Sequence, residues 1–167
     1  MLNNDCIEEL TGLKDIIVDD VKNVYGQQHI YLHMSKRIHI CPVCGEKTSK
    51  VHDYRTQTIK DISSYGQMTY LHLRKRRHVC PVCGKRFYEE VDFLPRYHRM
   101  TNRLAAYMMD QFADIQSMKQ IGKIAKASGQ TVTKIFDSIS YPKPLTPEVL
   151  SIDESRGDSG DEKFYAY

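Results

Sequence analysis

Two short cysteine motifs carry the clearest chemistry in this chain. They are Cys41-Pro42-Val43-Cys44-Gly45 and Cys80-Pro81-Val82-Cys83-Gly84. In each motif the proline presets a tight turn, and the glycine permits a left-handed backbone, so that amides can point at the sulfurs. Two such pairs supply four thiolates, the number that a closed structural zinc site takes. We therefore predict one zinc ion, and its ligands are Cys41, Cys44, Cys80 and Cys83.

The alternatives for these cysteines are two disulfides or free thiols. Disulfides persist in oxidising compartments, and nothing in the sequence directs the chain to one. The 35 residues between Cys44 and Cys80 exceed the roughly 15–20 residues of the usual ribbon loop. The extra length predicts a strand insertion between the two motifs. Cys6, the odd cysteine, is expected to be a small apolar residue on a short helix.

Four histidines flank the motifs, at positions 39, 52, 72 and 78. A site with four thiolates needs none of them. His39, His52, His72 and His78 are therefore expected at the surface or against phosphates rather than on the metal. His78, two residues before Cys80, is the one that merits attention.

The charge of the chain is uneven. The formal net charge is only +3, but residues 36–86 contain twelve lysines and arginines against three acidic residues. This local excess favours a polyanionic partner, nucleic acid first. The run Arg74-Lys75-Arg76-Arg77, with Lys85 and Arg86 nearby, is predicted to contact a phosphate backbone. The alternative is a solvated edge that blocks strand pairing. Strand alternation places half of these charges on each face.

The N-terminal part of the chain is expected to form strands, and the part after Pro95 is expected to form helices. Extended segments are predicted at residues 16–18, 21–25, 30–34, 51–55, 58–62 and 68–79. After Pro95 the composition becomes helical, with Thr101 as a plausible N-cap. Apolar residues at helical spacing predict three helices, at residues 101–115 and roughly 118–127 and 131–140.

The last two helices resemble a DNA-binding helix-turn-helix. Ala125 is small where the helices would cross, and Gly129 lies where the turn needs a positive φ. The residues left pointing outward, toward a major groove, are Gln130, Thr131, Thr133 and Lys134. Gln and Thr can read base edges and Lys can contact phosphate. An ordinary helical hairpin with a solvated outer face is the alternative.

The end of the chain carries a candidate catalytic carboxylate. Three prolines within residues 141–148 predict a stiff linker. Beyond it, residues 149–153 are expected to form a strand ending in Asp153, followed by a turn and a second strand. Such an aspartate fits the first metal ligand of an RNase H-like core, in which two metals clamp the oxygens of a phosphoryl transfer. A strand-end aspartate that caps a turn is the alternative.

No signal peptide and no apolar run of membrane-spanning length is visible in the sequence. The default expectation is therefore a cytoplasmic protein without a membrane partner. The 167 residues fit one to two small domains.

The ordered set of motifs resembles the N-terminal part of bacterial insertion-sequence transposases of the ISL-three family. The resemblance rests on the two cysteine motifs, Val51-His52-Asp53, the basic strand, and Arg86-Phe87-Tyr88-Glu89. Residues 101–104 and 121–136 resemble the helix-turn-helix that follows in that family. Ile152-Asp153-Glu154 matches the motif that opens its catalytic domain.

The resemblance implies a fold and a domain order. The fold class is α+β: a small β-rich zinc ribbon, a three-helix helix-turn-helix unit and the first hairpin of an RNase H-like domain. The expected boundaries are 1–94 for the ribbon with an N-terminal helix, 95–140 for the helix-turn-helix domain, 141–148 for the linker and 149–167 for the start of the catalytic domain.

The resemblance also implies a function. It is the recognition of transposon terminal inverted repeats in double-stranded DNA by a DDE transposase, with Asp153 as the first carboxylate. The second Asp and the final Glu have no counterpart, so this chain is expected to bind DNA without cutting it. Zinc would be structural, and Mg²⁺ would belong only to a complete catalytic domain. Homo-oligomerisation stays open, as do a stand-alone zinc-ribbon transcriptional regulator and an RNA-binding ribbon protein.

Overall fold

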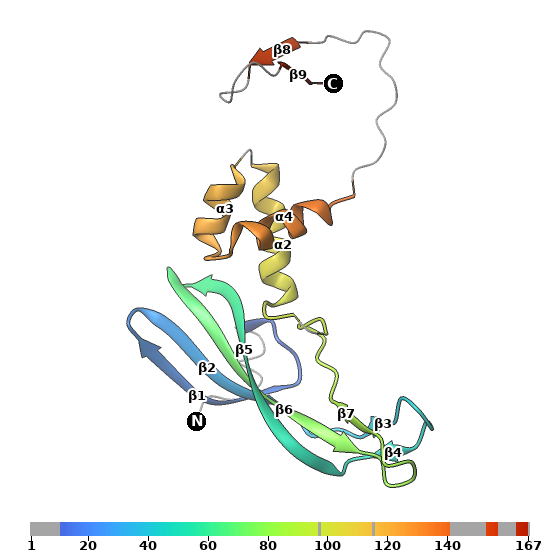
Figure 1. Ribbon diagram of the computed structural model, residues 1–167. Helices are drawn as coiled ribbons and strands as arrows, with labels where there is room; N and C mark the ends of the chain where they lie inside the picture. The colour runs from blue at the N-terminus through green and yellow to red at the C-terminus, as the bar shows by residue number, and fades with distance from the viewer. Residues whose placement is uncertain (1–10, 97, 115, 141–152, 157–162, 167) are drawn as a thin grey trace.

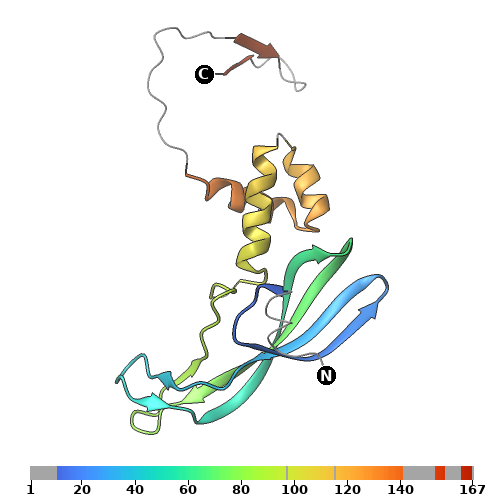
Figure 2. The ribbon, with the colours of Figure 1, turned by 180° about the vertical axis from the view of Figure 1, so that it is seen from behind.

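A long antiparallel hairpin of β5 (Val51–Ser64) and β6 (Gln67–Val79) runs through the fold in the computed structural model (Figure 1). The structure describes residues 11–96, 98–114, 116–140, 153–156 and 163–166. These residues form an α+β fold, rich in strands and with three helices. Seen from either side, the helices stand at one end of the hairpin and the cysteine motifs at the other (Figure 2).

The main sheet has the order β1-β2-β6-β5. β1 (Ile16–Val24) and β2 (Gln27–Met34) include the extended segments predicted before residue 35 and form an antiparallel hairpin, and β2 lies parallel to β6. At the far end of β6, the short β7 (Arg86–Tyr88) pairs with residues that lead into the second cysteine motif.

Residues 51–62 were expected as two short strands, and the structure corrects this expectation. β5 is continuous, because Arg55, Thr56 and Gln57 pair in register with Lys75, Arg74 and Leu73 of β6. No glycine or proline interrupts this stretch, and β-branched and long polar residues are compatible with a pleated, half-exposed edge strand.

One face of the sheet carries the first hydrophobic core. Alternating residues of β2, β5 and β6 meet there, since side chains two apart share a face. Segments before β1 and after β7 cover this core. Its buried residues are Leu13, Ile16, Leu32, Met34, Ile59, Leu71, Leu73, Val91 and Leu94.

Three helices form a second core beside the sheet. They are α2 (Asn102–Ala113), α3 (Met118–Ile124) and α4 (Gly129–Asp137). Thr101 is the N-cap of α2, as predicted, and its side chain accepts a hydrogen bond from the backbone N–H of Leu104. The buried residues of this core are Leu104, Met108, Ile121, Ala125, Val132 and Ile135.

The turn between α3 and α4 differs from the expectation by three residues. The positive φ falls at Lys126 (45°) and not at Gly129, which is the first residue of α4 after its N-cap Ser128. Ala125 is buried in the helical core, and Gly122 is a further small residue in close contact with the turn and α4. A Cβ built there would lie 3.3 Å from the Ala127 carbonyl oxygen and 3.5 Å from Cγ2 of Val132.

Asp61 joins the helical unit to the sheet. Its carboxylate, 1% exposed, accepts hydrogen bonds from the Thr101 hydroxyl and from Nε of Arg103, both at 2.7 Å. Arg103 also pairs with the second carboxylate oxygen and donates to the carbonyl of Thr11. Nearby, Nζ of Lys60 donates to the carbonyl of Lys126 at 2.6 Å. These contacts hold α2 and the α3–α4 turn against β5.

The C-terminal strands β8 (Asp153–Arg156) and β9 (Lys163–Ala166) pair as an antiparallel two-stranded sheet. This agrees with the predicted hairpin, except that the described strand begins at Asp153 instead of ending there. The linker at 141–148, residues 149–152 and Cys6 lie outside the described residues. In the described part of the chain, no helix is long and apolar enough to cross a membrane.

Candidate metal centre and nucleic-acid surface

The two cysteine motifs fold into matching knuckles. In the first, the Gly45 N–H donates to the Cys41 carbonyl at 3.0 Å and the Cys41 N–H to the Glu46 carbonyl at 2.8 Å. In the second, Gly84 and Cys80 repeat these bonds at 3.1 and 2.9 Å, the latter with the carbonyl of residue 85. Both glycines have positive φ, 73° and 70°, which explains why each motif ends in glycine.

The four sulfurs converge. The Sγ–Sγ distances are 3.5 Å for Cys41–Cys83, 3.4 Å for Cys44–Cys80 and 3.5 Å for Cys44–Cys83. Zn–S bonds of about 2.3 Å place the sulfurs of a tetrahedral site about 3.8 Å apart, so the cluster fits zinc with a small expansion. All four cysteines are free, and the sulfurs lie too far apart for disulfides. The predicted zinc ligands are therefore brought together.

Two hydrogen bonds connect the knuckles to each other. β3 (His39–Ile40) and β4 (Lys47–Thr48) form a small hairpin around the first knuckle. The Thr48 hydroxyl donates to the carbonyl of Val79 at 3.0 Å, and the Val79 N–H donates to the carbonyl of Lys50 at 3.0 Å. The strand that leads into the second knuckle is thus fixed beside the first one.

Without a cation between them, the neighbouring sulfurs oppose the ionisation of Cys44 and raise the pKa of its thiol. The backbone N–H of Cys44 lowers the pKa of Cys41 to about 6. For Cys44, the backbone N–H of Glu46 lowers the pKa, but the sulfurs of Cys80 and Cys83, together with burial, raise it to about 12. A bound Zn²⁺ removes this conflict because it stabilises four thiolates and releases the protons that they carried.

The histidines near the knuckles fall into two groups. His52 is exposed and lies 3.1 Å from Asp53, and His72 is half-buried on the open face of the sheet. His39 and His78 are buried, 8% and 2% exposed, so the expectation of a surface position is wrong for both. Burial and then the charge of His78 lower the pKa of His39 to about 4. Both rings lie beside Glu89, a grouping that we did not anticipate.

The basic run of β6 divides by environment. Arg74 is exposed and its guanidinium lies 4.0 Å from the ring centroid of Tyr54. Lys75 is half-buried, and burial lowers its pKa although Glu89 opposes this. Arg77 is half-buried and pairs with Asp53 at 2.5 Å. Burial raises the pKa of that carboxyl, but Arg77 and then His52 outweigh it and hold the pKa below its usual value.

Arg76 has a different role from the one expected. It is 6% exposed, pairs with Glu89 at 3.3 Å, and donates to the carbonyls of Met34 (2.6 Å) and Ser35 (3.1 Å). Its guanidinium is therefore occupied inside the protein and is not available to a phosphate. Lys85 and Arg86, by contrast, are exposed beside the second knuckle.

On α4, the residues predicted to face outward are mostly exposed. Gln130, Thr133 and Lys134 are exposed, whereas Thr131 is half-buried and its hydroxyl lies 2.9 Å from that of the N-cap Ser128. Val132 and Ile135 pack inward against the other helices. The side chain of Asp153 lies outside the described residues, so the structure does not test its predicted role.

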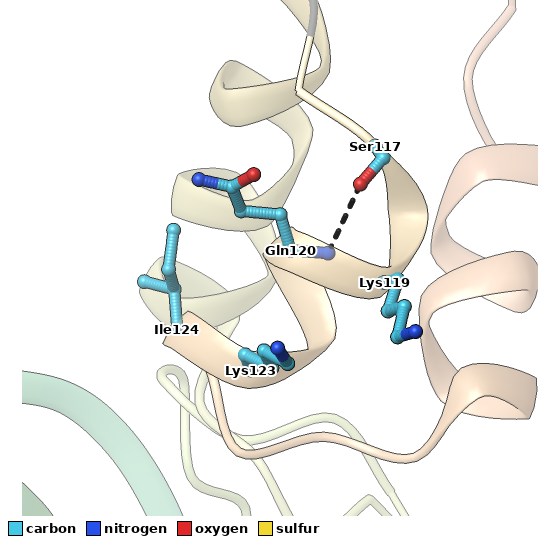
Figure 3. Close-up of a pocket in the computed structure, with 5 residues that line it drawn as sticks. All are labelled: Ser117, Lys119, Gln120, Lys123 and Ile124. Atoms are coloured by element: carbon cyan, nitrogen blue, oxygen red, sulfur yellow. Dashed lines mark hydrogen bonds between the residues drawn. The ribbon is translucent and has the colours of Figure 1, made fainter.

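An open hollow of about 480 Å³ lies along α3 (Figure 3). Two lysines line it, and the Ser117 hydroxyl accepts a hydrogen bond from the Gln120 N–H. Its shape and exposed lysines suit contact with an anionic surface better than enclosure of a small ligand. The lining residues are Ser117, Lys119, Gln120, Lys123 and Ile124.

Residues 37–83 match a family model described as the zinc-finger of transposase IS204/IS1001/IS1096/IS1165. The matched segment contains all four predicted zinc ligands and ends at Cys83, one residue before the glycine of the second motif. No curated protein and no solved structure matches the chain. The comparison therefore identifies a transposase-type zinc ribbon within this segment, and it leaves the helices and the C-terminal hairpin without a counterpart.

Proposed function

We propose that this chain is the DNA-binding N-terminal portion of a DDE transposase and that it recognises the ends of an insertion sequence. The observation that carries the proposal is the convergence of Cys41, Cys44, Cys80 and Cys83 inside the segment that matches a transposase zinc finger. Structural zinc sites of this kind stabilise small β-scaffolds that have little core of their own. The family match does not favour the stand-alone regulator.

The helical unit supplies the major-groove reader in this proposal. α3 and α4 are joined by a short turn in which Lys126 adopts the left-handed conformation, and Gly122, within α3, lies close to the Ala127 carbonyl and to Val132. A short turn between two packed helices supports the assignment of a helix-turn-helix. α4 then presents Gln130, Thr133 and Lys134 to a groove, while the two lysines of the α3 hollow meet the adjacent backbone.

The ribbon supplies backbone contacts. Its available cations are exposed or half-buried and lie on β6 and beside the second knuckle. With Arg76 removed from the expected set, they are Arg74, Lys75, Arg77, Lys85 and Arg86. Phosphate contacts fix register without carrying sequence information, so sequence preference should depend on α4.

Asp153, the first residue of β8, remains proposed as the first carboxylate of a two-metal site with Mg²⁺. Terminal inverted repeats are the proposed duplex partner, and homo-oligomerisation would let two chains hold two ends. The activity proposed for the residues described is binding.

Fluorescence anisotropy with labelled duplexes tests this proposal. We expect the zinc-loaded chain to bind duplexes copied from the two ends of its own element at least about 1,000-fold more tightly than a scrambled duplex, as specific sites generally require. Cys44→Ser removes a zinc ligand of the ribbon that supplies the backbone contacts, so it should weaken binding to both duplexes and leave the preference that depends on α4. Equal affinity for both duplexes would refute recognition of the ends, and tight binding only to the upstream promoter would establish the regulator instead.

A further inference from the structure

A second group of potential metal ligands lies beneath the cysteine knuckles. It consists of His39 on β3, His78 on β6 and Glu89 just after β7, and their ligand atoms lie within 4.8 Å of one another. All three residues are buried, at 8%, 2% and 2% exposure. The imidazole rings of His39 and His78 have centroids 4.2 Å apart.

Three of the four ring nitrogens of this group form no hydrogen bond with the described residues. Nε2 of His39 and both ring nitrogens of His78 are buried and make no hydrogen bond with the described residues. Leaving a buried polar atom unpaired costs about 1–3 kcal/mol, and native proteins rarely tolerate several together. Three such nitrogens beside a buried carboxylate suggest that another species completes their bonding.

Glu89 can bind a cation with one carboxylate oxygen while the other oxygen keeps its hydrogen bond. One of its oxygens accepts the Arg76 backbone N–H at 2.7 Å. The other lies 3.3 Å from Nη1 of Arg76, longer than the 2.7–2.9 Å of a strong charge-assisted bond. Arg76 also donates to the carbonyls of Met34 and Ser35. Its guanidinium would therefore stay bonded if this second oxygen turned to a cation.

We propose that His39, His78 and Glu89 bind a second divalent transition-metal ion, Zn²⁺ first, separate from the four-cysteine site. Two imidazoles and one carboxylate form a donor set that zinc accepts readily, whereas Mg²⁺ and Ca²⁺ prefer oxygen ligands throughout. Bonds of 2.0–2.1 Å would bring the donors roughly 3.4 Å apart. Rotation of the side chains within the cluster supplies the contraction.

The ion would have a structural role. His39 and His78 each precede the first cysteine of a knuckle by two residues, and the described residues show no ladder pairing between β3 and β6. A metal shared by these strands and by the segment after β7 ties the bases of both knuckles together. A water molecule would complete the coordination, since three protein ligands leave the fourth position of a tetrahedral ion free.

Metal stoichiometry and cobalt spectroscopy test the second site. After equilibration with excess Zn²⁺ and removal of free metal, elemental analysis should give two zinc ions per chain. Co²⁺ added to protein carrying one zinc should then produce visible d–d bands without a thiolate-to-cobalt charge-transfer band. A stoichiometry of one, or a cobalt spectrum that shows only thiolate coordination, overturns the proposal.

Variants assign the site to these residues. His39→Phe keeps a ring in the stack but removes a ligand, and it should weaken the second equivalent by at least about 100-fold, given that losing only an outer-shell partner costs 10–100-fold. Glu89→Gln should do the same. His33→Phe, which changes a half-buried histidine on β2 bonded to Asp19, is the control and should retain two ions. The charge-transfer band of the fully cobalt-substituted protein reports in each variant that the knuckles are folded. Retention of two ions by both ligand variants would contradict the assignment.

Discussion

Replacing Asp61 with alanine should destabilise the junction between the sheet and the helices. The buried carboxylate accepts hydrogen bonds from the Thr101 hydroxyl and from Arg103, which also forms an ion pair with it. Removing one partner of a buried ion pair typically costs 3–5 kcal/mol. Because the Arg103 side chain is 30% exposed, water solvates part of the freed charge, and the lower end of the range, about 3 kcal/mol, applies.

Urea unfolding followed by circular dichroism, with saturating zinc, measures this loss. A change of about 3 kcal/mol corresponds to a little over a hundredfold in the unfolding equilibrium. Asp20→Ala is the matched control, since Asp20 forms an exposed pair with Lys22 at 3.1 Å, and such pairs contribute 0–1 kcal/mol. In Asp61→Ala the amides of α2 should also exchange faster with solvent. If the two variants lose similar stability, the argument that Asp61 holds the helical unit in place is refuted.

Three further predictions concern zinc, DNA and pH. Chelation of zinc should lower the melting temperature, and the two knuckles should lose their ordered structure. An unchanged thermal transition in zinc-free protein would rule out the four-thiolate site. Lys134→Ala should weaken duplex binding and reduce the slope of log K against log salt by about 0.9, the value for one phosphate contact. Lys22→Ala is the control and should leave the slope unchanged. Equal slopes in the unmodified chain and in both variants would show that Lys134 makes no phosphate contact and would remove α4 from the interface. Burial, and then the charge of His29, lower the pKa of His72 in the folded protein. The unfolded chain therefore binds the proton more readily, and the free energy of unfolding should fall as the pH drops below about 6.5, the unfolded pKa. His72→Gln should make the difference in unfolding free energy between pH 7.5 and 5.5 smaller, and an equally large difference in the variant would show that His72 is not responsible.

The parts of the fold that depend on local chemistry could be predicted from the sequence. The Cys-Pro-Val-Cys-Gly motifs encode their own turns, so the four ligands were identified before their positions were known. Thr101 was recognised as a cap for the same reason. The predicted position of the turn before α4 is three residues too late, because glycine at 129 suggests a positive φ there. In the structure the Ser128 hydroxyl caps α4, and Lys126 takes the left-handed conformation.

The parts that depend on distant partners could not be predicted. Arg76 belongs to a run of cations that resembles a solvated edge, and its contacts with Glu89 and with the carbonyls of Met34 and Ser35, all distant in the sequence, hold it away from the surface. The burial of His39 and His78 likewise could not be predicted, because it depends on which distant segments cover these two side chains. The repeated spacing of a histidine two residues before each knuckle was a usable signal, and it points to the group now proposed to bind metal.

The continuity of β5 fixes a distance within the molecule. Residues 51–60 join the knuckle end to the helical end, and at about 3.3 Å per residue they span roughly 30 Å. This length is close to the 34–36 Å of one turn of B-form DNA. The paired strands thus set the distance between the knuckles and the helices. Inserting two residues into each strand would keep every side chain on its present face and would lengthen this distance by about 7 Å.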